Sequence, residues 1–467
     1  MKAQIKHTLY ASAISILIIG LFLGSCKKEV TVSVTEKINE FIKLSMEDVY
    51  LWEKYLPKID YKKETDSKAY FKKLLYEEDK WSFITDDIAA LEASFAGVET
   101  SFGYSLAFGR FSNTGYLFAL IEYVYPNSPA SIAGLKRGDI LFKLNGSDIT
   151  ELNYKNLLYG TTISVTLGIN NNGSISAGNT LSMTSQVLNL NPVLITKIIE
   201  INNRKIGYLF YAQYISSYNP SLDAAFLNFK SSGITDLVLD IRYNPGGFIS
   251  AAQYLCSSVA PLSVVSTAKT LVTLKWNDYY QNYWQNSNYP EQLQLNFKTN
   301  PAVNLNLNKI YILTGSGSAS ASELTITGLD PYMDVVLIGD TTYGKYTGSI
   351  TIKPEDLFED KEQYKDFSNW GLQPIVLRYA NANGVTDFKN GFAPQYYIYD
   401  NLWLGTPLGD ENEPLLAKAV ELIGGTIKAS PFKKQDIPDY EFISRGFSRF
   451  DMQKRNLIVD CIKFQIY

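Results

Sequence analysis

A serine cluster and a glycine–lysine pair are the residues of this sequence whose types and spacing could carry chemistry. The cluster is Ser318-Ala319-Ser320-Ala321-Ser322-Glu323, and Gly344-Lys345 follows it along the chain. The single histidine, His7, lies in a segment that we expect to be removed. A serine–histidine–aspartate triad is therefore excluded. If Ser320 is a nucleophile, Lys345 is the candidate for the group that takes its proton.

The serine cluster lies between a predicted strand, residues 310–313, and a predicted helix that ends at residue 329. A turn at this place exposes a hydroxyl, and the N–H groups of the helix N-terminus face a developing oxyanion. Ser320 and Glu323 also fit the capping box Ser-x-x-Glu, which needs no catalytic role. The local pattern leaves both interpretations open.

A glycine turn and the lysine complete the candidate site. Gly246-Gly247 ends a run that starts at Asp240, after a predicted buried strand. Glycines at this place let the backbone approach a ligand closely and can supply an oxyanion donor. Lys345 acts as a base only when it is neutral, so burial must lower its pKa from about 10.4 toward about 7–8. The alternative is a solvated loop lysine, the usual environment of this residue type.

An alternation of strands and helices must position these residues. A helix is predicted to start at Asn219-Pro220 and to run to about Lys230. The predicted strands are 205–211, 237–241, 310–313 and 335–338. This order predicts a largely parallel sheet with the site loops at the strand ends.

Two regions of different character precede this sheet. Residues 37–96 show helical periodicity, and strands and turns follow. The run from Ser128 to Gly146 combines a capped helix start, a Gly-Leu-x-x-Gly-Asp turn and a strand. With the strand that precedes it, this run resembles a PDZ domain.

The first 26 residues are typical of a bacterial lipoprotein leader. Lys2 and Lys6 precede the apolar run from Ala11 to Leu23, and Leu23-Gly24-Ser25-Cys26 resembles a lipobox. We expect Cys26 to be lipidated, which places the protein outside the cytoplasm on a bacterial membrane, in the periplasm or cell envelope. The alternative is an uncleaved anchor helix over residues 8–25.

Composition excludes several other classes of function. Charged residues are 19% of the chain and the formal net charge is −4, so no basic excess indicates nucleic acid. Without usable histidines or a Cys-x-x-Cys pair, we expect no metal site and no cofactor. Cys256 and Cys461 lie far apart in apolar surroundings, so buried free thiols are expected over a disulfide.

Taken together, these motifs resemble the carboxyl-terminal processing peptidases, also called tail-specific proteases. The resemblance covers about residues 67–425 and rests on five motifs: Asp79-Lys80-Trp81-Ser82, the PDZ run, Asp240–Gly247, Gly317–Glu323 and Thr341–Lys345. It implies that Ser320 is the nucleophile and Lys345 the general base. It also implies an oxyanion hole formed by Ala321 with Gly246 or Gly247.

Two positions depart from the family pattern. Many members have a glutamine four residues after the lysine, which orients it, and this position is Ser349 here. Some members have an aspartate eleven residues after the serine, and this position is Pro331, with Asp330 beside it. Ser349 and Asp330 are therefore the candidates for orienting Lys345.

The resemblance implies a multidomain α/β architecture with a ClpP- or crotonase-like catalytic core. We expect five parts: the leader 1–26, a tether and helical domain 27–96, a PDZ domain 97–190, the catalytic domain 191–429 and a C-terminal extension 430–467. An aromatic insertion, residues 276–300, is either a substrate lid or a surface excursion.

The expected function is that of a membrane-tethered serine endopeptidase. The PDZ groove, lined by Phe102-Gly103-Tyr104-Ser105, would bind the accessible C-terminus of a protein or peptide substrate. One alternative is a catalytically impaired relative that binds C-termini without cutting them. Another is an acyl-CoA enzyme, because the core resembles the crotonase fold.

Overall fold

The computed structural model describes residues 32–289, 292–424, 436–447, 455 and 457–460. The predicted leader with Cys26, and also Cys461, lie outside these residues. Cys256 is a buried free thiol. Within the described part of the chain, no helix is both long and apolar enough to cross a bilayer.

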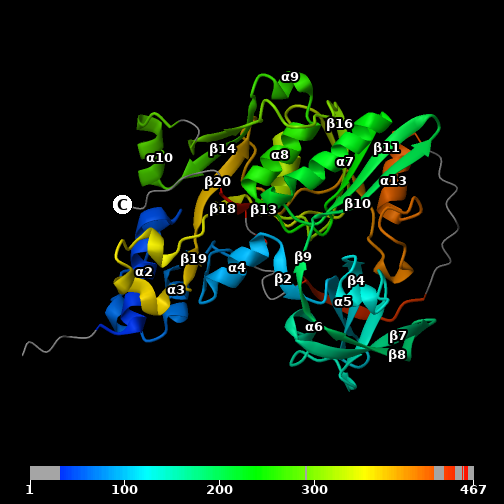
Figure 1. Cartoon of the computed structure of the whole chain (residues 1–467), viewed down its shortest axis with the longest axis horizontal. Coiled ribbons are helices and arrows are strands. Elements are labelled where there is room, and N and C mark those ends of the chain that lie inside the picture. The colour runs from blue at the N-terminus through cyan, green and yellow to red at the C-terminus, as the bar shows by residue number, and fades with distance from the viewer. Residues whose placement is uncertain (1–31, 290–291, 425–435, 448–454, 456, 461–467) are drawn as a thin grey trace, which may run out of the picture.

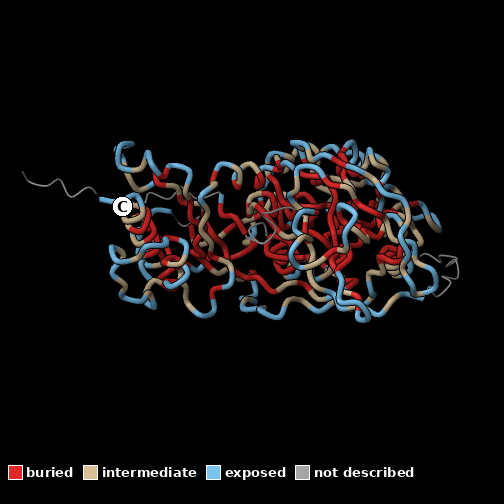
Figure 2. Tube along the Cα trace, turned by 90° about the horizontal axis from the view of Figure 1, so that it is seen from below, coloured by how far each residue is buried: buried red, intermediate tan, exposed pale blue. Residues whose placement is uncertain are grey.

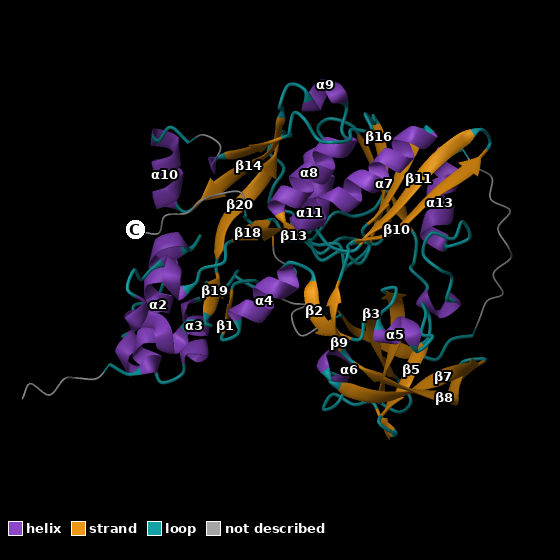
Figure 3. Ribbon diagram, in the orientation of Figure 1, coloured by secondary structure: helices purple, strands orange, loops and turns teal. Residues whose placement is uncertain are grey.

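A six-stranded sheet forms the centre of the C-terminal half (Figures 1 and 3). In spatial order its strands are β10 (Val193–Ile201), β11 (Arg204–Tyr211), β12 (Asp236–Asp240), β16 (Lys309–Thr314), β17 (Asp334–Gly339) and β21 (Tyr396–Tyr397). β10 is antiparallel to β11, and every other pair is parallel. The predicted parallel sheet is confirmed, and the loops after β12, β16 and β17 lie at one edge.

Helices cover both faces of this sheet because its strands alternate two sets of apolar side chains. Leu237 and Leu239 of β12 pack on one face with α7 (Asn219–Ser232), α8 (Ile249–Val259) and α11 (Ala321–Leu329). Val238 packs on the other face with α13 (Pro414–Ile423). The predicted helix from Asn219 is confirmed as α7, and its buried stripe consists of Leu222, Ala225, Phe226 and Phe229.

A second, mixed sheet lies beside the first. Its order is β13 (Gly247–Phe248), β23 (Leu457–Ile458), β18 (Thr347–Ser349), β20 (Ile375–Asn381), β14 (Thr270–Trp276) and β15 (Gln294–Asn296). The short strands β13 and β18 directly follow the glycine turn and Lys345. β23 comes from the C-terminal segment, which the sequence left unassigned, and it pairs parallel with both.

The N-terminal helices α2 (Val34–Val49) and α3 (Ser67–Leu74) are part of the same buried core, which runs through the middle of the molecule in Figure 2. Helix α4 (Ile88–Phe95) packs in a smaller buried cluster with Ile458 of β23. The aromatic insertion forms α10 (Asp278–Asn286), where Tyr280 donates a hydrogen bond to Asp48 at 2.9 Å. The described part of the insertion therefore packs on the N-terminal helices.

The domain that resembles a PDZ domain, called here the PDZ domain, lies below the two sheets in Figure 1. Its sheet has the order β22 (Tyr440–Gly446), β3 (Tyr104–Phe111), β4 (Leu117–Val124), β5 (Ile140–Leu144), β7 (Thr162–Asn171) and β8 (Ser174–Thr184), with β6 (Ser147–Asp148) beside β5. The predicted helix start is confirmed, since Ser128 Oγ accepts the N–H of Ser131 at 3.2 Å before α5 (Pro129–Ile132).

Shorter elements connect these units. They are β1 (Phe83–Thr85) paired with β19 (Gly371–Gln373), β2 (Val98–Ser101) paired with β9 (Gln186–Asn189), α6 (Asn156–Tyr159), α9 (Leu262–Val265), α12 (Lys361–Tyr364) and the 3₁₀ turns η1 (Glu53–Tyr55), η2 (Tyr61–Lys63), η3 (Ser216–Tyr218), η5 (Pro354–Asp356), η6 (Lys365–Phe367) and η7 (Leu402–Leu404).

Candidate active site

Ser320 lies in the turn between β16 and α11, and its backbone is strained. Its φ is 61° and its ψ is −108°, and the residue is 0% exposed. A non-glycine residue with positive φ costs about 1–3 kcal/mol and persists only where its surroundings impose it. The surroundings here are the two neighbouring serines and the turn after β12.

The three serines of the cluster have different environments. Ser318 Oγ donates to the carbonyl of Ile241 at 2.8 Å, and Ser322 Oγ donates to the carbonyl of Asn244 at 2.9 Å. Both bonds tie the serine turn to the loop after β12. The hydroxyl of Ser320 is buried and has no hydrogen-bond partner among the described residues. Since buried polar atoms are seldom left unpaired, this hydroxyl is the exceptional one.

Only half of the predicted capping box forms. Glu323 accepts the N–H of Ser320 at 2.8 Å, as in a capping box. The hydroxyl of Ser320 makes no cap hydrogen bond to the first turn of α11 and has no partner among the described residues. Capping therefore accounts for Glu323 but not for the Ser320 side chain.

The carboxylate of Glu323 also joins the serine turn to the lysine loop. It accepts the N–H of Lys345 at 2.8 Å, the N–H of Gly344 at 2.5 Å and the hydroxyl of Thr342 at 2.7 Å. The N–H groups of Ser320 and Lys345 both bind its Oε2 atom. Burial raises the pKa of Glu323 to about 7, although these hydrogen bonds oppose the shift.

Tyr379 of β20 makes a second bridge between the same two residues. Its hydroxyl lies 3.0 Å from the carbonyl oxygen of Lys345 and 3.2 Å from that of Ser320. Glu323 thus binds the two N–H groups, and Tyr379 binds the two carbonyls. Ser320 and Lys345 are held close together by shared partners. No sequence pattern pointed to Tyr379, which lies 59 residues after Ser320.

Lys345 is completely buried, so it is not the solvated loop lysine of the alternative interpretation. It is 0% exposed. Burial lowers its pKa well below the ordinary value, and the negative charges of Asp79 and Glu323 partly offset this effect. Its Nζ lies 5.6 Å from the centre of the Trp81 ring. A buried lysine of this kind is neutral more often than a solvated one.

The Asp79–Ser82 motif brings Trp81 to Lys345. Asp79 Oδ1 accepts the N–H groups of Trp81 and Ser82, each at 2.9 Å, and Oδ2 accepts the hydroxyl of Tyr50 at 2.7 Å. Ser82 Oγ accepts the N–H of Ile375 at 2.8 Å. These bonds fasten the N-terminal helical region to β20, beside the lysine. The sequence singled out the motif but not this arrangement.

The glycine turn lies directly against Ser320. A Cβ at Gly246, whose φ is 114°, would lie 2.8 Å from Ser320 Cβ and 3.2 Å from the nitrogen of Ala321. The close approach therefore requires glycine. The N–H of Gly246 donates to Asn244 Oδ1 at 3.0 Å. A Cβ at Gly247 would lie 2.2 Å from the carbonyl oxygen of Tyr214.

The two residues predicted to orient Lys345, Asp330 and Ser349, have different surroundings in the structure. Asp330 is exposed at the C-terminal end of α11. Nine helical residues, about 13 Å of helix, separate it from Ser320. Ser349 is buried, but within the described residues its hydroxyl bonds the carbonyl of Leu457 at 3.4 Å and Gln373 Nε2 at 3.2 Å rather than Lys345. Gln373 is completely buried and was not anticipated.

The predicted peptide-binding residues belong to the PDZ sheet and its first loop. The carbonyls of Phe102 and Gly103 accept the N–H groups of Ala130 and Tyr125, and Tyr104 pairs with Val124. All four predicted residues, Phe102, Gly103, Tyr104 and Ser105, are buried. Ser105 lines a cavity that also touches Pro245, Gly317 and Arg445. The start of β3 therefore faces the serine and glycine turns.

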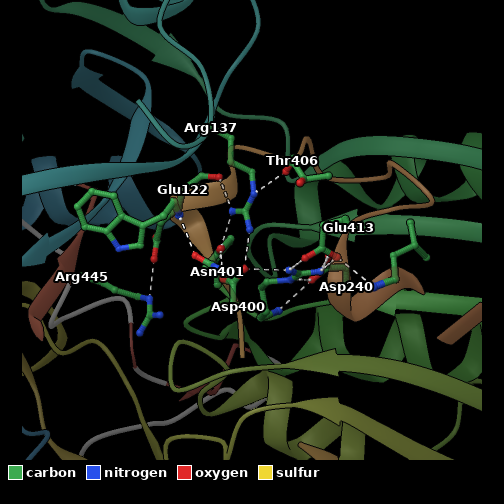
Figure 4. A network of polar contacts seen from close by, with 12 residues as sticks. Glu122, Arg137, Asp240, Asp400, Asn401, Thr406, Glu413 and Arg445 are labelled. Carbon is green, nitrogen blue, oxygen red and sulfur yellow. Dashed lines mark hydrogen bonds and ion pairs between the residues drawn. The ribbon is translucent and has the colours of Figure 1, made fainter. Parts of the chain in front are cut away.

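A buried network starts in the loop that leads to the glycine turn. Arg242 forms paired hydrogen bonds to Asp240, at 2.9 and 2.8 Å, and to Glu413, at 2.7 and 2.9 Å (Figure 4). The arginine is 2% exposed and the two carboxylates are completely or nearly completely buried. Paired geometry of this kind compensates the loss of hydration.

Arg137 connects the PDZ domain to this network. Its Nη2 lies 2.5 Å from Asp400 Oδ1, and its Nη1 donates to the hydroxyl of Tyr243 at 2.6 Å (Figure 4). Asp400 also lies 3.2 Å from Arg242 and accepts the hydroxyl of Tyr243. Although burial raises the pKa of Asp400, the two arginines hold it well below the ordinary value. A continuous ionic path therefore joins the PDZ domain to the loop before the glycine turn.

No group of three or more histidine, cysteine, aspartate or glutamate side chains arranged to hold a metal ion occurs in the described ranges. Among the described residues, the groups around Ser320 and Lys345 include the carboxylates of Glu323 and Asp79, the hydroxyl of Tyr379 and backbone groups. This arrangement can support nucleophilic attack by a serine with a neutral amine nearby.

Models of known protein families match three parts of the chain. The description "Peptidase family S41" matches residues 205–398, and "Peptidase S41 N-terminal domain" matches residues 37–83. A PDZ domain matches residues 120–167. The two S41 matches together cover more than half of the chain. The first contains Ser320 and Lys345, and the second contains the whole Asp79–Ser82 motif.

Curated relatives are named as processing proteases. The chain is 25% identical over 324 residues to the chloroplastic C-terminal processing peptidase of Tetradesmus obliquus, which is 67% of this chain and 62% of the relative. It is 24% identical over 283 residues to a carboxy-terminal processing protease of Bacillus subtilis, 59% of this chain and 52% of the relative. The chain thus spans less than two thirds of the length of these relatives.

A solved structure has the same fold over most of both chains. The crystal structure of a candidate S41 protease from Bacteroides fragilis superposes with a TM-score of 0.66 at 29% identity. The superposition covers 82% of this chain and 96% of the other. The expected architecture of helical N-terminal region, PDZ domain and α/β peptidase core is confirmed.

Proposed function

This chain belongs to peptidase family S41, the carboxyl-terminal processing serine proteases with a PDZ domain, and on that premise we propose that it is an endopeptidase with a Ser320–Lys345 dyad. The observation that carries the proposal is the buried hydroxyl of Ser320, which has no hydrogen-bond partner among the described residues and lies on a strained backbone. Glu323 and Tyr379 hold this residue beside the buried Lys345. Neutral Lys345 takes the proton of Ser320 as its Oγ attacks the scissile carbonyl carbon.

The remaining steps follow from the same groups. The N–H of Ala321 and an N–H of the Gly246-Gly247 turn stabilise the oxyanion. The close approach of Gly246 to Ser320 and to the nitrogen of Ala321 supports this assignment. Protonated Lys345 then gives its proton to the leaving amine, which leaves an acyl-enzyme on Ser320. Water attacks the ester while Lys345 takes a proton from it, and Lys345 then gives this proton to Ser320 Oγ as the acyl–oxygen bond breaks and the carboxylic acid is released.

The substrates in this proposal are extracytoplasmic proteins whose C-termini engage the PDZ domain. The position of Ser105, in a cavity shared with Pro245 and Gly317, supports a path from the PDZ domain to the catalytic turns. The lipobox-like run ending at Cys26 supports a lipid anchor on a bacterial membrane. We keep the five predicted domain boundaries as part of this proposal.

Two substitutions test the dyad. Ser320→Ala and Lys345→Ala are each expected to lower the cleavage rate of an unfolded protein by about 10⁴-fold or more, because nucleophile and base act as a unit. The measurement is the initial rate of fragment formation with the full chain. Ser266→Ala and Lys269→Ala, at exposed positions, are the matched controls and should keep full activity. A normal rate for Lys345→Ala would disprove the dyad.

One observation favours a second candidate function, that of a protein that binds peptides without cutting them. Ser320 and Lys345 are both 0% exposed, so this conformation presents no open catalytic centre. A serine-reactive phosphonate probe separates the two functions. Labelling of Ser320 in the wild-type chain, absent from Ser320→Ala, supports the protease, and no labelling together with peptide binding supports the binding protein.

A further inference from the structure

The C-terminal segment contributes a strand to the edge of the PDZ sheet. β22 pairs antiparallel with β3, from Tyr440 opposite Phe111 to Gly446 opposite Leu106. In Figure 1 it is the red strand beside the cyan strands of the PDZ domain. β3 pairs with β4 on its other side, so it would be an edge strand without β22. Such an edge is where PDZ domains bind an extended peptide as an added strand.

The direction of β22 is that of a bound ligand. Its C-terminal end lies toward the start of β3, next to the loop of Phe102 and Gly103 where we expected a substrate C-terminus. Gly446 and Phe447 continue into the cavity lined by Ser105 and Pro245. A strand of the same segment, β23, then lies between β13 and β18 of the candidate active site. The segment thus contacts both the peptide-binding edge and the catalytic elements.

One ionic contact makes the edge selective. Arg445 Nε lies 2.5 Å from Glu122 Oε1, and Ser105 Oγ donates to the other carboxylate oxygen at 2.7 Å. Glu122 is 1% exposed, and Arg445 is its one cationic partner within ion-pair distance among the described residues. Arg445 also donates to Ser316 Oγ, at 2.6 Å, just before the serine cluster. A buried carboxylate without a cation is strongly destabilised, so this edge favours a strand that carries one.

We propose that the edge of β3 is a binding site for extended peptide segments with a basic residue at the position of Arg445, and that β22 occupies this site in cis. Glu122 is then the residue that determines the specificity of the site. A peptide from another molecule must displace β22 before it can bind. The inference rests on the proposed function only in regarding that peptide as a substrate.

The test uses a labelled peptide and the full chain. The peptide has the sequence of residues 437–447, and the protein carries Ser320→Ala so that nothing is cut. In a variant, a glycine–serine stretch of equal length replaces residues 440–446 and leaves β23 in place. We expect this variant to bind the peptide at least tenfold more tightly than the Ser320→Ala chain, by fluorescence anisotropy, because a tethered strand competes at about millimolar effective concentration. A peptide with Arg445→Glu should bind at least tenfold more weakly.

A second variant covers the case in which the replacement unfolds the PDZ domain. Arg445→Glu in the full chain places a carboxylate against Glu122 and should free the edge for the wild-type peptide. Arg204→Glu is the matched control, since it reverses an exposed arginine that pairs with Asp236 away from β22. The proposal is overturned if folded variants bind no peptide, or if the Arg445→Glu peptide binds as well as the wild type. Binding is read without catalysis, so failure of the protease proposal is detected separately by the phosphonate probe.

Discussion

At the scale of single residues, Glu323 and Asp79 determine the state of the candidate dyad. Glu323 binds the N–H groups of Ser320 and Lys345 with one oxygen, so the carboxylate fixes the backbone of both. Asp79 acts at longer range, through its charge and through the N–H of Trp81, whose ring lies near Lys345 Nζ. Burial thus lowers the pKa of the lysine, and the charges of these two carboxylates partly offset that effect.

The pH dependence of the cleavage rate tests this tuning. In the proposed mechanism the active form of Lys345 is neutral, so we expect the rate to rise as the pH increases through the pKa of Lys345 in the folded protein. The charge of Asp79 raises that pKa against the larger lowering effect of burial. Asp79→Asn removes the charge but keeps an oxygen for the N–H groups of Trp81 and Ser82. The acidic limb of the pH–rate profile should therefore move to lower pH.

Asp330→Asn is the control for this experiment. It removes an exposed carboxylate at the far end of α11 and should leave the acidic limb unchanged. A limb that moves with Asp330→Asn and not with Asp79→Asn would show that the sequence-based candidate, rather than Asp79, controls the lysine.

At the scale of elements, two glycine-containing turns bring three strand ends together. Gly246 lets the turn after β12 touch Ser320, and Gly344 lets the loop after β17 pass the segment of Lys389. A Cβ at Gly344, whose φ is 94°, would lie 2.4 Å from the carbonyl oxygen of Lys389. Since the next residue is Lys345, any shift of this loop displaces the lysine.

Gly344→Ala tests the geometry of the loop. Alanine at position 344 has to keep a positive φ, and its Cβ clashes with the carbonyl oxygen of Lys389. We therefore expect the unfolding free energy to fall by about 1–3 kcal/mol and most of the activity to be lost. Gly233→Ala is a matched control, because its φ is 70° but nothing lies within 4 Å of the added carbon. It should cost about 1–2 kcal/mol and retain activity. Urea denaturation gives the unfolding free energy and initial cleavage rates give the activity. Equal activities of the Gly344→Ala and Gly233→Ala variants would contradict a role of this loop in positioning Lys345.

At the scale of the whole molecule, buried ionic contacts join domains that are far apart in the sequence. Arg137 of the PDZ domain reaches Asp400, and Arg445 of the C-terminal segment reaches Glu122 (Figure 4). Asp400 also pairs with Arg242, in the loop after β12, and Arg445 also donates to Ser316, in the loop after β16. The arrangement predicts that the PDZ domain and the catalytic core lose stability together.

Arg137→Ala tests this coupling. It leaves Asp400 with one arginine, Arg242, and Tyr243 without its donor. We expect a loss of up to about 3–5 kcal/mol, because a buried carboxylate loses one of its two arginine partners. Arg110→Ala removes a surface pair with Glu151 and should cost about 0–1 kcal/mol. The measurement is chemical denaturation followed by near-ultraviolet circular dichroism. A small, equal cost for both variants would show that the contact between domains is not stabilising.

The sequence by itself determined much of the catalytic core. Hydrophobic periodicity and capping residues are properties of short segments. They were therefore enough to predict the strand before the serines, α11 and the capped start of α5. The absence of a usable histidine made lysine the candidate base, and the motif order identified the family. These are features of residue type and short spacing, which the chain carries whatever its tertiary contacts.

Only the tertiary structure decided which residues surround the candidate dyad and what the C-terminal segment does. Tyr379 reaches Ser320 through a strand 59 residues away, and Asp79 reaches Lys345 from the N-terminal region. Ser349, assigned by spacing, bonds Gln373 instead. β23 has two residues, too few for a decisive pattern, and β22, which has seven, lies in a segment that the sequence left unassigned. Both become strands because β3, β13 and β18 offer unpaired edges. Such pairing depends on partners distant in sequence, and no local pattern specifies it.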